Sequence, residues 1–129
     1  MDWKLEVVVA PVEDVARAKE FYTGIGFAAD FDEGEGDGRT VQLTPPGSGC
    51  SVVLGRQVQH GEPGSLSAQL VVEDVEAARA HLLAHGARVS PVQHFTEDGA
   101  LAEGRGEGWN SFVFFTDPDG NRWSVQQRP

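Results

Sequence analysis

The side chain in this sequence best suited to proton transfer is His94, because an imidazole titrates close to neutral pH. It ends an apolar run that is typical of a strand and precedes a loop rich in glycine and acidic residues. A general acid or base could occupy this position. A solvated surface histidine beside Glu97 and Asp98 fits the same residues, and both interpretations stay open. The other histidines fall in a linker or near a helix, where we expect them to be solvated: His60, His81 and His85.

Three further features could contribute to chemistry: Trp109, Cys50 and the acidic segment 32–38. Trp109 closes the long loop and could stack on a flat ligand, although core packing explains it equally well. Cys50 has no neighbouring histidine that could activate a thiolate, so we expect a small core residue. The acidic segment 32–38 lacks the ligand order and closing glutamate of a calcium-binding loop, so it predicts a solvated hairpin tip.

The charge balance limits the class of partner. The 129 residues include 20 acidic and 10 basic side chains, which gives a formal net charge of −10. This argues against nucleic acid, because binding to phosphates needs clustered lysine and arginine. An acidic surface attracts cationic ligands where the charge converges on a cleft, and it also keeps a protein soluble.

The sequence shows no membrane span, no secretory signal and no pair of cysteines. No apolar run approaches the roughly 20 residues that cross a membrane, and the first residues carry no secretory signal. The single cysteine, Cys50, cannot form an internal disulfide. These features predict a cytoplasmic protein with no membrane partner.

A repeated phrase indicates which elements position these residues. Val12-Glu13-Asp14-Val15 and Val72-Glu73-Asp74-Val75 lie sixty residues apart, and each follows an apolar run and opens an amphipathic helix. The aspartate of each phrase is a good N-cap residue. A unit of this size cannot bury its own apolar face, so the repeat predicts two similar modules that pack together.

Both copies predict the same order of elements, strand–helix–strand–strand–strand. In the first copy we expect a helix after Asp14 and strands over 5–12, 27–31, 39–43 and 50–54. In the second copy we expect a helix after Asp74, a loop over 96–108, and strands over 67–72, 88–95, 111–115 and 122–127. The inward residues of the second helix are predicted to be Val75, Ala78, Leu82 and Leu83.

This order predicts one α+β domain over residues 1–129. Module one covers about 3–56, a linker covers 57–65, and module two covers about 66–128. A sheet with a helix on one side leaves its other face uncovered. Two tandem βαβββ modules therefore predict a half-open barrel with a central pocket.

The two phrases, together with segments 21–27 and 115–123, resemble the vicinal oxygen chelate superfamily. This superfamily contains glyoxalase I, extradiol dioxygenases, fosfomycin-resistance enzymes and bleomycin-resistance proteins. The resemblance extends over roughly residues 5–127, and its last segment is similar to the family's final hairpin. It implies a pocket in which side chains from four strands hold a divalent metal ion.

The family's metal-binding positions fall here on residues that are unsuited to metals. By resemblance, the two histidine positions fall on Val7 and Ser67, the last-strand carboxylate falls on Ser124, and its counterpart falls near Val53. Valine has no donor atom, and a serine hydroxyl is a poor ligand for zinc, iron, manganese or nickel. We therefore expect no metal site and no cofactor.

The same resemblance predicts the residues that line the pocket, because strand neighbours at i±2 share a face. With Gln42 from the third strand and Trp109 from the loop, the predicted ligand-binding residues are Val7, Val9, Gln42, Ser51, Val53, Ser67, Gln69, Trp109, Arg122, Ser124 and Gln126. Their neighbours of opposite phase should pack under the helices: Val8, Ala10, Leu70, Val72, Trp123 and Val125.

Three functions fit this pocket. The first is metal-independent binding of a small molecule, similar to the antibiotic-sequestering branch of the superfamily, with cationic and aromatic antibiotics or metabolites as candidates. The second is a metal-independent lyase or isomerase acting on a carbonyl compound, with His94 as acid or base and Arg122 stabilising an oxyanion. The third is a vestigial pocket in a partner-binding domain. The resemblance also implies a homodimer, and the sequence leaves open whether a reaction is catalysed.

Overall fold

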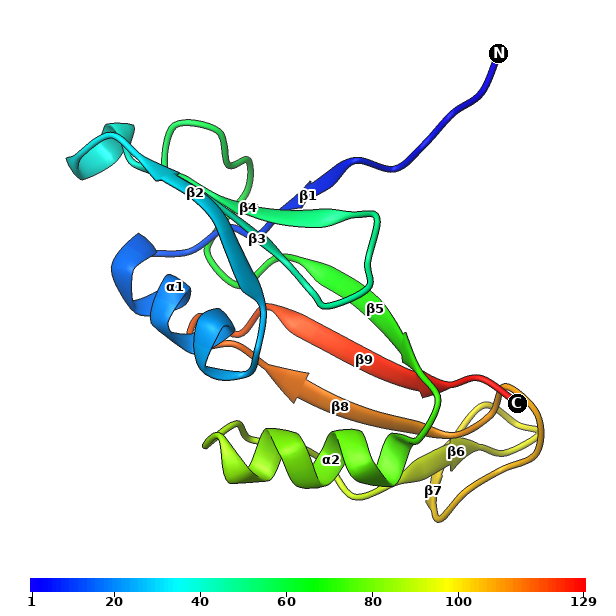
Figure 1. Cartoon of the computed structure of the whole chain (residues 1–129). Coiled ribbons are helices and arrows are strands. Elements are labelled where there is room, and N and C mark those ends of the chain that lie inside the picture. The colour runs from blue at the N-terminus through cyan, green and yellow to red at the C-terminus, as the bar shows by residue number, and fades with distance from the viewer. The chain divides into compact units, whose positions relative to one another are not determined.

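The computed structural model describes all residues, Met1–Pro129, and the chain divides into two compact units (Figure 1). Unit 1 comprises Met1–Leu66 and Asp117–Asn121, and unit 2 comprises Ser67–Thr116 and Arg122–Pro129. Each unit contains one open sheet and one α-helix, which confirms the predicted α+β class with two modules. Neither helix combines the length and the apolar character that crossing a membrane requires.

Unit 1 contains a four-stranded sheet in the order β1-β4-β3-β2. Strand β1 runs parallel to β4, and the other pairs are antiparallel. The elements are β1 (Val7–Val9), α1 (Val15–Gly24), β2 (Ala28–Glu33), the one-turn 3₁₀ helix η1 (Gly36–Gly38), β3 (Thr40–Thr44) and β4 (Ser51–Leu54). The predicted first strand is shorter than expected, and η1 forms the exposed tip of the acidic hairpin.

Helix α1 begins where the sequence predicts it. The Asp14 carboxylate accepts a hydrogen bond from the Arg17 amide at 3.1 Å, which satisfies one of the unpaired N–H groups of the first turn. Val15, Ala18 and Tyr22 form its buried stripe. They share a core with alternate residues of β3 and β4: Val41, Leu43, Val52 and Leu54.

Unit 2 contains a five-stranded sheet in the order β5-β9-β8-β6-β7, in which β5 and β9 are parallel. The elements are β5 (Ser67–Val72), α2 (Val75–Ala84), β6 (Gln93–Phe95), β7 (Leu101–Glu103), β8 (Phe112–Thr116) and β9 (Arg122–Gln127). The Asp74 carboxylate accepts hydrogen bonds from the amides of Glu76 and Ala77, so the second predicted N-cap is also confirmed.

Two predictions about the strands of unit 2 are wrong. The strand expected over 88–95 is reduced to an isolated bridge between Val89 and Phe115 and to the three residues of β6. Pro91 interrupts the run, because proline has no N–H to donate to a strand ladder. The loop expected over 96–108 contains β7, which returns along β6 after a tight turn at Thr96–Gly99.

The prediction that Leu83 faces inward with Leu82 is also wrong. Leu82 is buried, whereas Leu83 is 48% exposed. Successive helical residues are separated by about 100°, so a helix that buries Val75 and Leu82 turns Leu83 toward solvent. Val75 and Leu82 are seven residues apart, which is about two helical turns, so both lie on the same buried stripe.

The turn Asp117–Asn121 joins β8 to β9 and belongs to unit 1. The Asp117 side chain accepts hydrogen bonds from the Tyr22 hydroxyl at 2.7 Å and from the Asn121 amide at 2.8 Å. It also accepts from the backbone N–H groups of residues 119 and 121. The Asn121 amide group donates to the Pro11 carbonyl and accepts from the Leu66 N–H. The turn therefore binds the strand-to-helix connection, helix α1 and the linker at once.

Gly64 allows the linker to approach this turn. Its φ is +88°, and a Cβ atom built on it would lie 2.2 Å from the Asp119 carbonyl oxygen. Its N–H donates to the Pro11 carbonyl at 3.0 Å. Only glycine combines this backbone conformation with the required space.

Loss of the Tyr22 hydroxyl should destabilise the protein. In Tyr22→Phe the buried Asp117 carboxylate loses one donor, which should lower the free energy of unfolding by about 1.5–3 kcal/mol in urea denaturation. Glu20→Gln, an exposed change on the same helix, is the control and should stay within about 0.5 kcal/mol of the parent protein. Equal stability of Tyr22→Phe and the parent would contradict the role of this hydrogen bond.

Two glycine substitutions separate backbone strain from steric clash. Gly47 and Gly64 have φ angles of +80° and +88°, but a Cβ atom meets nothing within 4 Å at Gly47. Gly47→Ala should therefore cost only the strain of a positive φ, about 1–2 kcal/mol. Gly64→Ala should cost more than that, because the linker must also move away from the turn. Equal unfolding free energies for the two variants would show that the close approach carries no cost.

Candidate binding site

The sheet of unit 2 has one face covered by α2 and one face without a helix. The Gln127 side chain accepts a hydrogen bond from the Val75 N–H at the start of α2, at 3.0 Å. Trp123 and Val125 share the phase of Gln127 in β9 and are buried, as expected for residues under the helix. Arg122, Ser124 and Gln126 therefore point to the opposite side, which we call the open face of unit 2.

Strand register arranges the open face of unit 2 in three rows. Arg122 pairs with Ser67 and Thr116, Ser124 pairs with Gln69 and Phe114, and Gln126 pairs with Val71 and Phe112. The antiparallel bridge between Val89 and Phe115 places Arg88 opposite Thr116. The first row thus runs across the sheet as Ser67, Arg122, Thr116 and Arg88.

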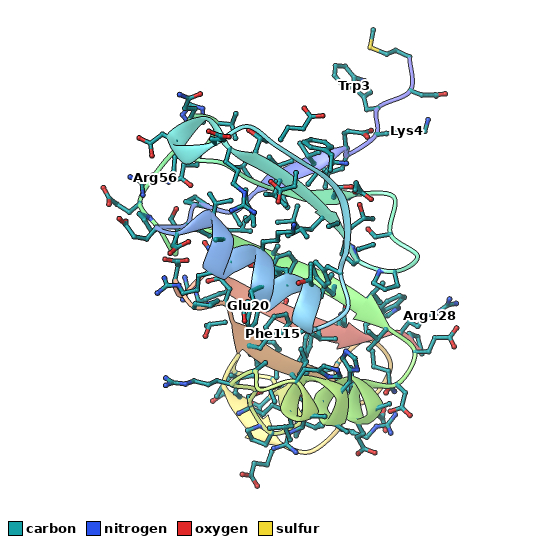
Figure 2. The ribbon with its side chains drawn as sticks, turned by 60° about the vertical axis from the view of Figure 1, so that its left-hand side comes forward. Trp3, Lys4, Glu20, Arg56, Phe115 and Arg128 are labelled. Atoms are coloured by element: carbon teal, nitrogen blue, oxygen red, sulfur yellow. The ribbon has the colours of Figure 1, made fainter.

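A hollow of about 490 Å³ lies over the first two rows. Its volume is within the range of roughly 300–1,000 Å³ that is usual for small-molecule sites. Its lining residues are Ser67, Arg88, Phe114, Phe115, Thr116, Arg122, Trp123 and Ser124. Figure 2 labels Phe115, which belongs to β8 and whose ring stacks on that of Trp123 at 6.1 Å between centroids.

Hydrogen-bonded side chains connect the second and third rows. The Ser124 hydroxyl donates to Gln69 Oε1 at 3.0 Å, and Gln69 Nε2 donates to Gln126 Oε1 at 2.9 Å. Gln126 Nε2 then donates to the Trp109 carbonyl at 2.7 Å. We call these side chains the amide chain. It fixes the orientation of both glutamines and holds the loop that carries Trp109.

Three phenylalanines form an aromatic cluster on the same face. The rings of Phe112 and Phe114 are stacked with centroids 5.9 Å apart, and the Phe95 ring meets Phe112 edge-on at 5.3 Å. Phe95 is exposed, and Trp109 is 55% exposed. The sequence interpretation missed this cluster, although the alternation in β8 carries its signal: Phe112 and Phe114 have the opposite phase to the buried Val113 and Phe115.

Five predicted ligand-binding residues lie together in unit 1. Asp32, which pairs with Val41, is bound by Lys19 of α1 at 2.8 Å, so this phase of the sheet faces the helix. The opposite phase carries the predicted set Val7, Val9, Gln42, Ser51 and Val53, which register places side by side. Their contact with a ligand stays a prediction.

A β-bulge adds a carboxylate to that face of unit 1. The pairing of β2 with β3 shifts between Ala29 and Phe31, which leaves Asp30 as the extra residue. Its carboxylate accepts hydrogen bonds from Gln42 Nε2 at 3.2 Å and from the Thr44 hydroxyl. These two donors lower the pKa of Asp30. The alternation of apolar and polar residues in the sequence does not reveal this bulge.

His94 lies apart from the hollow. Its neighbour Phe95 packs on the open face of unit 2, so His94 points to the other side of β6. There its Nδ1 atom lies 2.9 Å from the Gly104 carbonyl oxygen. The structure thus brings Ser67, Gln69, Arg122, Ser124 and Gln126 together and places His94 elsewhere. A catalytic role for His94 stays a prediction.

The residues do not fit the divalent metal ion that the resemblance implies. No group of three or more histidine, cysteine, aspartate or glutamate side chains is placed to hold an ion. The hollow of unit 2 is lined by hydroxyl, guanidinium and aromatic side chains. None of these is a usual ligand for zinc, iron, manganese or nickel.

Comparisons with known proteins agree on one fold. TnmS3, an antibiotic binding protein from Streptomyces sp. CB03234, is 28% identical, has a TM-score of 0.78, and the match covers 99% of this chain and 98% of TnmS3. A glyoxalase/bleomycin resistance protein from the same organism is 29% identical, with a TM-score of 0.75 and coverage of 96% and 100%. A search of curated proteins finds no match.

A more distant structure shares the fold. A member of the same superfamily from Sphaerobacter thermophilus DSM 20745 is 24% identical, with a TM-score of 0.73 and coverage of 98% of both chains. The family model of the Glyoxalase/Bleomycin resistance protein/Dioxygenase superfamily matches residues 4–125, nearly the whole sequence. This protein therefore belongs to the Glyoxalase/Bleomycin resistance protein/Dioxygenase superfamily.

Proposed function

We propose that this protein binds a small aromatic molecule on the open face of unit 2 without a metal ion, and so sequesters an antibiotic or a metabolite. The observation that carries the proposal is that an aromatic cluster, an amide chain and a hollow occupy one face of one sheet. The antibiotic binding protein TnmS3, 28% identical over nearly its full length, supports a sequestering role.

The aromatic side chains supply the apolar part of such a site. Phe95 remains exposed on a face whose other residues are mostly polar, and Trp109 is exposed on the loop that Gln126 holds. Exposed apolar groups rimmed by polar ones commonly mark ligand-binding grooves. A flat ligand would stack on these rings, and each such contact contributes about 0.5–1.5 kcal/mol beyond the burial of its area.

The amide chain supplies the polar part. Each glutamine amide uses one hydrogen within the chain and keeps a second hydrogen for another acceptor. The Ser124 hydroxyl donates to Gln69 and can still accept. Because these groups are already oriented, a ligand that bonds to them costs little additional side-chain entropy.

The residue types in the hollow favour binding over catalysis. Its lining contains no aspartate, glutamate, histidine, cysteine, lysine or tyrosine. Arginine cannot act as a base near neutral pH. The serines and the threonine that line the hollow have no neighbouring base to activate them. The alternative of a carbonyl lyase or isomerase would require His94 to act from the other side of β6.

We also propose that the chain forms a homodimer. Trp3 is 87% exposed, and Figure 2 shows it on a segment that leads away from the sheet of unit 1. Leu5 is also exposed. Large apolar side chains on an extended segment gain free energy when a second chain covers them.

Binding should be detectable with planar aromatic compounds. Native mass spectrometry with a panel of planar aromatic and cationic glycopeptide antibiotics should reveal complexes with the aromatic members. Phe95→Leu keeps an apolar side chain but removes stacking, so it should weaken affinity by about 3–10-fold. Leu83→Ala, on the solvent side of α2, is the matched control and should bind normally. No complex with any compound would refute the proposal.

His94→Ala separates binding from catalysis. This variant should bind the same aromatic compound with unchanged affinity, because His94 lies outside the open face of unit 2. Conversion of a carbonyl substrate by the parent protein that disappears in His94→Ala would favour the lyase or isomerase instead.

The homodimer should appear in sedimentation velocity as a species of twice the chain mass. Trp3→Ser should shift the equilibrium toward the monomer, because it removes a tryptophan side chain that is 87% exposed. Val58→Ser, an exposed position in the linker, is the control. A parent protein that sediments as a single chain at every concentration tested would exclude the dimer.

A further inference from the structure

We propose that Arg88 and Arg122 form a carboxylate-binding site at one end of the open face of unit 2. The ligand would then be an aromatic carboxylate, with its acid group at the first row and its rings over the aromatic cluster. This inference rests on the proposed small-molecule binding and adds the charge and orientation of the ligand.

The first observation is that these arginines have no acidic partner. Five of the ten basic side chains form ion pairs with aspartate or glutamate: Arg17, Lys19, Arg39, Arg56 and Arg105. Arg88 and Arg122 form none, although the chain carries 20 acidic residues. Two arginines on one face that have no acidic partner, in a protein this acidic, can bind an anionic group of a ligand.

The second observation is their position. Arg122 and Arg88 flank Thr116 in the first row, each one strand away from it. Neighbouring strands lie about 4.8 Å apart, so the two side chains leave the sheet roughly 10 Å apart on one face. Both line the same hollow. Long guanidinium side chains at this separation can converge on one small group between them.

The third observation concerns the hydroxyl groups in the same row. Ser67 and Thr116 line the hollow beside the arginines, and neither side chain makes a hydrogen bond within the protein. A guanidinium matches the two oxygens of a carboxylate with parallel N–H groups. The row therefore presents two guanidinium groups and two hydroxyl groups that can all donate to a carboxylate, and no carboxylate of the chain lines the hollow to compete for them.

For a ligand in the hollow, the positive charge of the two nearby arginines matters more than the negative net charge of the protein. A formal charge of −10 favours cationic ligands at long range. At physiological ionic strength, however, charges more than about 8 Å away are largely screened. A ligand seated in the hollow therefore senses mainly Arg88 and Arg122.

The second row determines where the rest of the ligand lies. Phe114 lines the hollow and pairs with Ser124, one row beyond the arginines. It stacks on Phe112, which pairs with Gln126 in the third row. A carboxylate held by the first row therefore directs an attached ring system over Phe114 and toward Phe112.

Three matched naphthalenes test the charge. In isothermal titration calorimetry, 2-naphthoate should bind about tenfold more tightly than the neutral 2-naphthamide, and the cationic 2-naphthylmethylamine should bind most weakly. Arg122→Gln and Arg88→Gln should each weaken 2-naphthoate by about tenfold and leave 2-naphthamide unchanged. Both positions are exposed, so these variants should fold, which circular dichroism verifies.

The outcomes separate this inference from the proposed function. Arg128→Gln is the matched control, because Arg128 is exposed, lies outside the hollow and has no acidic partner. Equal affinity for 2-naphthoate and 2-naphthamide, or tightest binding of the amine, would overturn the carboxylate site and leave aromatic binding intact. Arginine variants that bind 2-naphthoate like the parent would do the same. No binding of any of the three compounds would count against both proposals.

Discussion

A carboxylate that is only 4% exposed, such as that of Asp117, is stable only when donors replace the water it has lost. The Tyr22 hydroxyl, the Asn121 amide and two backbone N–H groups provide that replacement. The turn so fixed is flanked by Thr116 on one side and Arg122 on the other. Two residues of the first row, Thr116 and Arg122, are therefore anchored by a turn whose buried carboxylate accepts four hydrogen bonds, and such anchoring suits recognition of a ligand.

In a sheet with one face covered by a helix, alternate residues of each strand have different roles: one set packs in the core and the other set lies on the open face. In β9, Trp123 and Val125 are buried under α2, whereas Arg122, Ser124 and Gln126 alternate with them on the open face. In β8, Val113 and Phe115 are buried while Phe112 and Phe114 face their polar partners of β9. On the open face, Phe112 is the only residue of β8 and β9 that is buried, so the other positions there can change their chemistry at little cost in stability. Serine and valine at the positions where the resemblance implies metal ligands are therefore compatible with the fold.

Signals from residues close in the sequence predicted the helices and most strands. The site was predicted less completely, because it depends on pairing between strands that are distant in the sequence. The N-caps at Asp14 and Asp74 and the strands 67–72 and 122–127 depend on neighbouring residues and agree with the structure. The prediction of a strand over 88–95 is wrong because Pro91 breaks the ladder, and β7 was missed because the whole strand is only three residues long. Alternation identified Arg122, but only the pairing of Val89 with Phe115 reveals Arg88 beside it. The bulge at Asp30 depends likewise on a distant strand.

The order of strands in the unit 2 sheet has a consequence for synthesis on the ribosome. Strand β9 lies between β5 and β8, yet it is translated after both of them. Until residue 127 leaves the exit tunnel, β5 has no partner in its sheet and β8 lacks the neighbour on one edge. Unpaired edges of this kind are prone to association with other chains. The nascent protein therefore passes through an interval in which β5 and one edge of β8 are unpaired and open to association with other chains.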